Sequence, residues 1–328
     1  MDDVARLAAV ARAALPRFGI PEASPVALLH HRENAVFRVD DDGSARPWAL
    51  RVHRLGYRTG DEIRSELAWM DALRAAGLHT PAARPALDGD PLQRVAAPEL
   101  REPRYVDVLS WIEGKPLDVA GAPDAYRLLG RTCAFLHAHA RRWTPPSWFR
   151  RPTWEAERLL GPRAHWGDFA DLAALAPDEL ALLQRAAALV LRRLHAFGQG
   201  PDRFGLTHGD LMPENILVQD GVPHVIDFDD CGYGWYLYDL ATLLALKTAD
   251  PDFERIRDGW VAGYRELAPL PDAHLVELET LVMARMLLGL GWMHTRRETP
   301  MAQAFTGAAI ALSCAQAEAI LRREEGRP

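Results

Sequence analysis

Lysine is almost absent from this chain. Of its 38 basic residues only Lys115 and Lys247 are lysines, so arginine carries nearly all of the positive charge. A chemical role that requires a lysine therefore has only two candidates. The sequence also lacks a cluster of basic residues, and its formal net charge at pH 7 is -7. Nucleic acids and anionic membranes attract positive surfaces, so neither is expected as a partner.

Cysteine is scarce, and long uncharged hydrophobic runs are missing. The three cysteines, Cys133, Cys231 and Cys314, are far apart and lack the spacing of a zinc site. This usage is typical of a reducing compartment, so we expect a cytoplasmic protein. The longest apolar run, "LVMARMLLGLGWM" from Leu281, is interrupted by Arg285 and is too short to span a bilayer. It is expected to be a core helix.

The length and composition indicate two folded parts. A chain of 328 residues exceeds the size at which one hydrophobic core usually keeps growing. The first 20 residues have the pattern of an amphipathic helix rather than a signal peptide. Alternating apolar residues predict strands within residues 26–39, at 48–53, as a hairpin at 85–95 turning at 88–90, and at 105–111. A helix is predicted at 59–77. We therefore expect a first domain, residues 1–112, with a five-stranded antiparallel sheet and one main helix.

The second predicted domain, residues 113–328, is mostly helical by its periodicity. The expected helices are 124–143, 178–197, 239–249, 253–267, 273–294 and 301–323. His137, in the first of these helices, is expected to be a packing residue. Between the second and third helices lies the polar stretch "THGDLMPENILVQDGVPHVIDFDD", Thr207 to Asp230. The expected fold class is α+β, with a small β-rich lobe followed by a larger, mostly helical lobe.

The polar side chains of this stretch predict phosphoryl transfer. Asp210 and Asn215 lie five residues apart on one loop, and Asp227 follows an apolar, β-rich run. Transfer from a magnesium nucleotide requires a carboxylate that accepts a proton from the attacking hydroxyl, and hard oxygen ligands for Mg²⁺. An isolated Asp in a turn is usually a cap. The joint pattern instead favours a catalytic base and a pair of metal ligands.

The motifs "HGDLMPENILV", "VIDFDD" and "YDLA" resemble those of the aminoglycoside phosphotransferase and choline kinase superfamily, whose members share the bilobal protein-kinase-like fold. The resemblance covers most of the chain, but only these motifs are specific. It implies that Asp210 is the catalytic base and that Asn215 and Asp227 bind magnesium. It also implies that His208 is structural and that Asp239 is a buried acceptor holding the catalytic loop. For Asp239, capping the following helix is an equal alternative.

The resemblance further implies a nucleotide site in the first domain. Glu33 and Asn34 would form the phosphate-facing hairpin turn. Arg51 stands where the family usually has lysine, and neither lysine of the chain can replace it by position. Arginine can still bind phosphate and carboxylate groups, although the two cations are not interchangeable. Glu66, on the following helix, would be its ion-pair partner. Backbone groups of a hinge would bind the adenine, at residues Ser110, Trp111 and Ile112.

The acceptor is indicated less directly. Asp229, Asp230 and Trp235 follow the metal-binding strand, and carboxylates with aromatic faces favour a cationic acceptor. Turn capping and packing are alternatives of similar weight. The expected activity is ATP- and Mg²⁺-dependent phosphorylation of a small-molecule hydroxyl of the aminoglycoside, homoserine or choline type, with GTP also possible as donor. The alternatives are a protein kinase of the bacterial stress-response type and a nucleotide-binding pseudokinase, the latter suggested by Arg51.

Overall fold

The chain folds into two compact units. The computed structural model describes residues 4–97, 102–120 and 124–326. The first unit comprises residues 1–117, 145–151 and 214–229, and the second comprises 118–144, 152–213 and 230–328. The predicted single boundary after residue 112 does not account for the two later segments of the first unit. These segments enter it through strand pairing and buried hydrogen bonds, which sequence proximity does not reveal.

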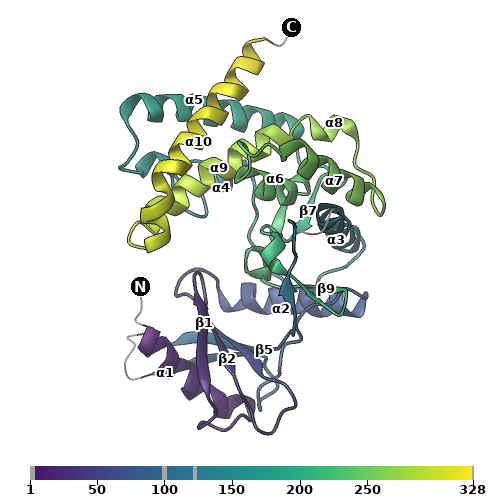
Figure 1. Cartoon of the computed structure of the whole chain (residues 1–328). Helices are drawn as coiled ribbons and strands as arrows, with labels where there is room; N and C mark the ends of the chain where they lie inside the picture. The colour runs from purple at the N-terminus through teal and green to yellow at the C-terminus, as the bar shows by residue number, and fades with distance from the viewer. Residues whose placement is uncertain (1–3, 98–101, 121–123, 327–328) are drawn as a thin grey trace. The chain divides into compact units, whose positions relative to one another are not determined.

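The first unit contains the predicted five-stranded antiparallel sheet, in the order β1-β2-β3-β5-β4 (Figure 1). Its strands are β1 Val26–His31, β2 Ala35–Val39, β3 Trp48–Val52, β4 Leu92–Val95 and β5 Arg104–Ser110. The predicted hairpin at 85–95 is wrong. The turn itself is present, because the Gly89 N–H donates to the Ala86 carbonyl at 2.9 Å. Only the segment after the turn becomes a strand, β4, and it pairs with β5 rather than with the segment before the turn.

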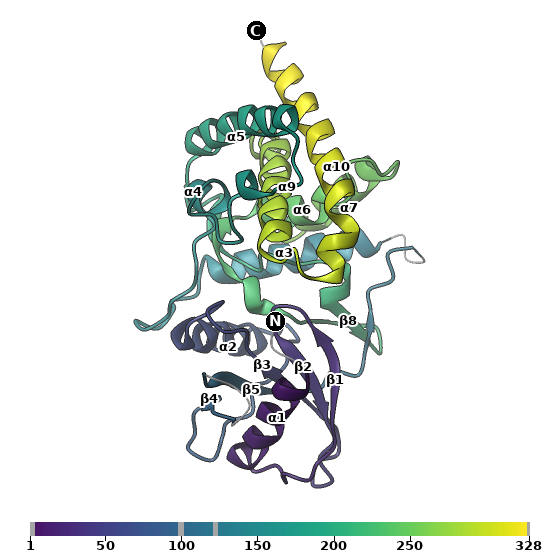
Figure 2. The same ribbon diagram turned by 90° about the vertical axis from the view of Figure 1, so that its left-hand side faces the viewer.

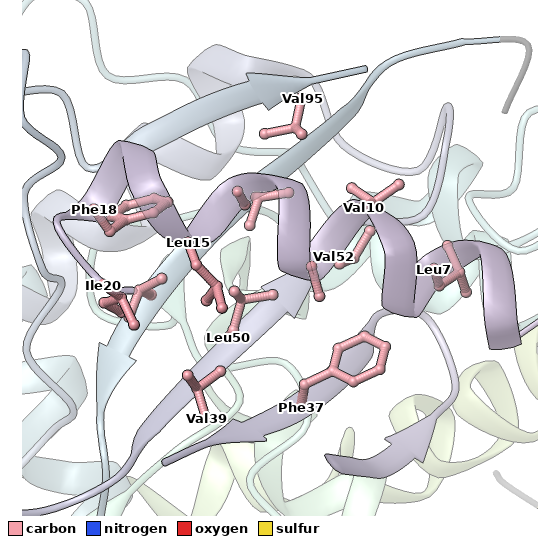
Figure 3. Close-up of a cluster of buried hydrophobic side chains, with 14 of the residues drawn as sticks. Leu7, Val10, Leu15, Phe18, Ile20, Phe37, Val39, Leu50, Val52 and Val95 are labelled. Atoms are coloured by element: carbon pink, nitrogen blue, oxygen red, sulfur yellow. The ribbon is translucent and has the colours of Figure 1, made fainter. Parts of the chain in front are cut away.

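An N-terminal helix covers the sheet with apolar side chains. It consists of α1, Val4–Ala14, and a 3-10 turn, Leu15–Phe18. Figure 3 shows the helix lying across the strands, with its apolar residues directed at theirs. The buried cluster includes Leu7, Val10, Leu15, Phe18, Phe37, Val39, Leu50, Val52 and Val95. Removal of this apolar surface from water is a main source of stability. It fixes β3 and its neighbours, which carry charged candidate residues.

The main helix of the first unit, α2, spans Gly60–Ala75. Thr59 and Glu62 form a capping box at its start: the Thr59 hydroxyl accepts from the Glu62 N–H at 3.3 Å, and the Glu62 carboxylate accepts from the Thr59 N–H at 2.8 Å. The buried face contains Ile63, Leu67 and Met70 at helical spacing. Glu66 lies on this same buried face, so its carboxylate is enclosed and must find a partner.

A second small sheet joins distant segments within the first unit. It is formed by β6 Lys115–Pro116, β8 Ile216–Gln219 and β9 Val222–Val225, in that order. Asp220 and Gly221, at φ 52° and 77°, connect β8 to β9 in the left-handed conformation typical of a two-residue hairpin turn. The Val225 N–H donates to the His79 carbonyl at 2.9 Å. This sheet brings residues 214–229 into the first unit.

The second unit is mostly helical, as predicted. Its helices are α3 Ala125–Ala140, α4 Ala156–Leu159, α5 Pro177–Phe197, α6 Leu237–Ala245, α7 Phe253–Arg265, α8 Asp272–Leu275, α9 Leu278–Thr295 and α10 Pro300–Glu325. Strands β7 Phe204–Thr207 and β10 Gly232–Trp235 pair antiparallel. The predicted helix 273–294 is divided into α8 and α9. Figure 2 shows α9 flanked by α5 and α10, and most of its residues are buried, as expected of a core helix.

Helix α10 has one property that the sequence reading did not single out. Among the described residues it alone is long and apolar enough to cross a membrane, with a mean hydropathy of 1.4 and 22% of its apolar window buried. This likeness rests on length and composition alone, and a single such helix is weak evidence for a membrane span.

Candidate functional site

The predicted site residues are divided between the two units. The boundaries fall between Pro213 and Glu214 and between Asp229 and Asp230. Asn215, Asp227 and Asp229 therefore belong to the first unit, together with Arg51 and Glu66. The second unit contains Asp210, Asp230 and Asp239. Each set has its own geometry.

In the first unit Arg51 is enclosed by two carboxylates. Its Nη1 donates to Glu66 Oε1 at 2.6 Å, so the expected partner is present. Its Nε and Nη2 donate to both oxygens of Asp107 at 2.8 and 2.6 Å. Asp107 Oδ2 also lies 3.0 Å from His53 Nε2. Asp107 was not predicted, although an aspartate inside the apolar strand "YVDVLSW" indicates a buried charge that needs a partner.

Burial and charge oppose each other in this cluster. Burial lowers the pKa of Arg51, but the charges of Asp107 and Glu66 outweigh it and raise that pKa well above its usual value. Burial favours the neutral acid of Asp107, yet the guanidinium of Arg51, and then His53, hold its pKa well below its ordinary range. Arg51 and Asp107 therefore remain charged at physiological pH.

Arg151 balances the second carboxylate of the cluster. Its Nη1 lies 3.9 Å from Glu66 Oε2, and both side chains are fully buried. Arg151 also donates to the Glu62 carbonyl at 2.9 Å and to the Asp229 carbonyl at 2.6 Å. It thus links α2 to the segment that follows Asp227. Its position, distant in sequence among 36 arginines, gave no signal of this role.

A backbone hydrogen bond brings the chain segments of the two candidate metal ligands together in the first unit. The Ile226 N–H donates to the Asn215 carbonyl at 3.0 Å, which brings Asp227 beside Asn215. Asp227 has φ 63°, a left-handed conformation that is strained for residues other than glycine and is enriched at functional sites. The next turn is held by Arg58 and Arg151, which both donate to the Asp229 carbonyl, at 2.9 and 2.6 Å.

The donor set fits magnesium that arrives with a nucleotide. One carboxylate and one amide oxygen are hard ligands of the kind that Mg²⁺ prefers. Within residues 4–97, 102–120 and 124–326, no group of three or more His, Cys, Asp and Glu side chains is gathered for a metal. Asn215 and Asp227 alone do not form a complete protein cage, and Mg²⁺ bound through substrate phosphates does not need one.

The predicted hinge and hairpin residues have structural partners. The Ser110 N–H donates to the Ala82 carbonyl at 2.8 Å, and its hydroxyl accepts from the Ala82 N–H at 2.8 Å. The Ser110 N–H is thus paired with Ala82, and β5 ends at Ser110, so Trp111 and Ile112 follow the strand. The contact of the Ser110–Ile112 backbone with adenine stays a prediction. In the β1–β2 turn, Asn34 is buried and its amide oxygen accepts from the Arg54 N–H at 3.3 Å, whereas Glu33 is half-buried.

In the second unit, Asp239 holds the backbone beside Asp210. Its carboxylate accepts from the Gly209 N–H at 2.8 Å and lies 3.0 Å from His137 Nε2. Burial raises the pKa of Asp239, but the hydrogen bond from His137 keeps it below its ordinary value. The alternative of a helix cap is wrong, because α6 begins at Leu237 and Asp239 lies inside its first turn. His137 is therefore more than a packing residue.

Gly209 is required by the shape of this loop. Its φ of 83° is left-handed, and a Cβ there would lie 2.6 Å from the Asp230 carbonyl oxygen. Its own carbonyl accepts from the Thr242 hydroxyl at 3.3 Å. His208 is fully buried, and its Nδ1 lies 3.3 Å from the Asp210 N–H. These contacts fix the backbone of the candidate catalytic loop.

The carboxylate of Asp210 is held by an arginine that was not predicted as a site residue. Arg285 Nη2 donates to Asp210 Oδ1 at 2.9 Å, and its Nη1 lies 3.4 Å from the Tyr238 hydroxyl. Burial raises the pKa of Tyr238 to about 12, so its hydroxyl stays neutral. A charged residue inside the apolar run that begins at Leu281 indicated that Arg285 needs a partner. The sequence could not identify that partner, because Asp210 lies 75 positions earlier in the chain.

The predicted acceptor residues differ in their surroundings. The Asp230 carbonyl accepts from Trp154 Nε1 at 2.9 Å, and its charge contributes to the raised pKa values of Tyr238 and Arg285. Trp235 is only 1% exposed and donates its indole N–H to the Gly198 carbonyl at 2.8 Å. These contacts agree with the packing alternative for Trp235, and its contact with an acceptor stays a prediction.

Comparisons with known proteins agree on one family. Residues 26–274 match the family model described as "Phosphotransferase enzyme family". The structure of a microcompartment-associated aminopropanol kinase is 36% identical, with a TM-score of 0.88 over 97% of this chain and 98% of that chain. Amicoumacin kinase of Bacillus subtilis is 24% identical over 294 residues, 86% of this chain and 83% of that protein. An uncharacterized protein of Deinococcus radiodurans is 31% identical over 252 residues, 75% of this chain and 71% of that protein.

Proposed function

Because the chain belongs to the phosphotransferase enzyme family and is a small-molecule kinase acting on alcohol groups, we propose that it uses ATP and magnesium to phosphorylate the hydroxyl of a small amino alcohol. The observation that carries the choice of acceptor is the likeness to the aminopropanol kinase, at 36% identity over nearly the whole of both chains.

The first unit supplies the residues for the nucleotide. Asn215 and Asp227 would hold magnesium, which when bound neutralises charge on the phosphates. Three of the five N–H groups of Arg51 donate to Asp107 and Glu66, which leaves two for a phosphate oxygen. An arginine can thus serve where the family usually has a lysine. The pseudokinase alternative was suggested by an arginine in the place of the family's usual lysine. Arg51 nevertheless forms the expected ion pair with Glu66, so this argument for a pseudokinase is weakened.

The second unit supplies the residues for the acceptor. Asp210 is 29% exposed and would accept the hydroxyl proton of the alcohol. Asp230 adds a second carboxylate, and its negative charge helps to raise the pKa values of Tyr238 and Arg285. Asp210 and Asp230 thus place two carboxylates near Arg285 and Tyr238. Carboxylates at the site favour an acceptor that carries an ammonium group near its hydroxyl.

The proposal is tested by measuring nucleotide consumption with a panel of acceptors. The panel contains 1-amino-2-propanol, ethanolamine, choline, homoserine, an aminoglycoside and 2-propanol, with ATP or GTP as donor and with or without Mg²⁺. We expect turnover with ATP, Mg²⁺ and a short amino alcohol, and much weaker turnover with 2-propanol, which lacks the amine. Equal rates for the two propanols would contradict the amine preference.

Asp210→Asn provides the control for chemistry. The amide cannot accept the proton, so turnover should fall by about 10²-fold or more while ATP still raises the unfolding temperature. Full activity in this variant would rule out the assigned base. Labelled ATP offered to a protein extract tests the alternative: transfer to proteins with none to the panel would favour a protein kinase.

A further inference from the structure

Arg285 lies in an unusual place for a charged residue. It is the only charged side chain of α9 between Glu279 and His294, and most of this helix is buried. The side chain is 15% exposed. A buried charge costs several kcal/mol unless it is paired and hydrogen-bonded. Its presence in a core helix therefore calls for a specific partner, and Asp210 is that partner.

The geometry of Arg285 is fixed by aromatic groups. Its guanidinium carbon lies 4.4 Å from the ring centre of Trp166 and 5.9 Å from that of Tyr238. Trp166 precedes Gly167, and a Cβ at Gly291 of α9 would meet the Gly167 carbonyl at 2.1 Å, so the two backbones are in close contact. A cation over an aromatic face is stabilised by the ring. The guanidinium is thus held before any substrate binds.

The candidate catalytic loop has no cation of its own. Residues 207–215, "THGDLMPEN", contain neither lysine nor arginine. Backbone contacts through Asp239, Thr242 and His208 fix the loop, whereas Arg285 is the residue that contacts the Asp210 carboxylate from α9. Arg285 therefore acts on the Asp210 carboxylate itself, whereas Asp239, Thr242 and His208 act on the loop backbone.

We propose that Arg285 is a positioning residue for phosphoryl transfer: it binds Asp210 Oδ1 and so orients the carboxylate that accepts the proton of the acceptor hydroxyl. This inference rests on the proposed function. A small misplacement of a catalytic group can reduce the rate by about 10²-fold. A cation 2.9 Å from a carboxylate also favours its charged form. Loss of Arg285 is therefore expected both to free the orientation of the Asp210 carboxylate and to make it easier to protonate.

The experiment compares Arg285→Met with the wild-type enzyme and with Arg193→Met. Arg193 is a matched control, because it is a buried arginine of the same unit, 7% exposed, that pairs with Glu324 and lies 3.4 Å from the Thr280 hydroxyl. We expect kcat of Arg285→Met to fall about 10- to 100-fold, with the KM for ATP changed less than about threefold. The acidic limb of its kcat/KM profile should move to higher pH, because loss of the cation raises the pKa of the base.

Arg193→Met should lose stability but keep the wild-type kcat and acidic limb at temperatures where it is folded. The inference fails if Arg285→Met behaves in the same way. If Arg285→Met does not fold, Arg285→Lys carries the test. Lysine keeps the positive charge but not the fixed fork of donors. We therefore expect kcat to fall while the acidic limb of the kcat/KM profile stays at the wild-type pH. An unchanged kcat would overturn the inference. Failure of the proposed function is distinguishable, since the wild-type enzyme itself would then show no turnover with the panel.

Discussion

The two units place arginine and carboxylate in opposite arrangements. In the first unit a cation, Arg51, is enclosed by Asp107 and Glu66, whose side chains are fully buried. In the second unit a carboxylate, Asp210, accepts a hydrogen bond from Arg285 and remains 29% exposed. The first arrangement buries both carboxylates, whereas the second leaves a charged group partly exposed. We expect the enclosed ion pairs of Arg51 to contribute mainly to stability and the charges around Asp210 to contribute mainly to turnover.

Replacement of Asp227 tests whether the first unit contains a residue that contributes to turnover rather than to stability. Asp227→Gly removes the carboxylate and relieves the strain of a left-handed residue. Turnover should fall by about 10²- to 10³-fold, the loss seen when one charge-stabilising group is removed from an active site. The free energy of unfolding should rise by about 0.5 kcal/mol. Both are measured on one preparation, by steady-state kinetics and by urea unfolding.

Asp220→Gly is the matched control, since Asp220 has φ 52° in the β8–β9 turn of the same unit. It should gain similar stability without loss of turnover. Equal turnover in the two glycine variants would show that Asp227 does not bind the metal.

Arg51→Lys tests the expected contribution to stability directly. Lysine offers a single charged nitrogen and cannot pair with both oxygens of Asp107 and with Glu66 at once. The free energy of unfolding should fall by roughly 1.5 to 3 kcal/mol, measured by urea unfolding. Adding Asp107→Asn removes the carboxylate that lysine leaves poorly paired. The double variant should therefore recover part of the loss.

Arg64→Lys is a control of the same chemistry in the same unit. Arg64 also contacts both oxygens of an aspartate, Asp90, at 3.3 and 2.7 Å, but the pair is about one-third exposed. Its replacement should cost less than about 1 kcal/mol. Equal losses of unfolding free energy in Arg51→Lys and Arg64→Lys would mean that burial of the Arg51–Asp107 pair does not increase its contribution to stability.

His137 gives the smallest expected effect and tests the closed interior of the second unit. Burial lowers the pKa of His137 below its usual 6.5, although Asp239 opposes this. Below about pH 6.5 the unfolded chain binds a proton that the folded chain does not, so folding stability falls as the pH decreases. Between pH 7.5 and 5.5 this contributes up to about 1 kcal/mol.

In His137→Gln this part of the pH dependence should disappear, as measured by urea unfolding at both values. Thr242→Val removes a contact to the same loop, at the Gly209 carbonyl, without removing a titrating group. It should lower stability equally at both pH values. An unchanged pH dependence in His137→Gln would show that His137 does not titrate differently in the folded chain.

Local features of the fold could be predicted because neighbouring residues determine them. Thr59 and Gly77 bracket α2, and alternating apolar residues mark the strands of the first sheet. The hairpin at 85–95 failed because a tight turn does not require both of its arms to pair. The assignment of residues 145–151 and 214–229 to the first unit depends on contacts between distant segments, which periodicity does not contain.

The candidate site was predictable where the chemistry is concentrated in one motif. Asp210, Asn215 and Asp227 stand within 18 residues of sequence, so their types and spacing indicate their reaction. Arg285 contacts Asp210, and Arg151 contacts Glu66 and the Asp229 carbonyl, both from distant segments of the chain. The sequence contains 36 arginines, and nothing in it distinguishes these two by their partners. Asp107 could have been found, because a carboxylate within an apolar strand must be paired.

An arginine at position 51 also determines which reagents the enzyme resists. A guanidinium neither loses its proton at physiological pH nor forms adducts readily with the electrophiles that capture amines. The chain's two lysines are Lys115, exposed at the edge of β6, and Lys247, paired with Asp250 at 3.2 Å. Acylating reagents and amine-directed nucleotide probes would therefore modify this kinase without touching the buried cation, and its activity would survive treatments that silence enzymes relying on a lysine there.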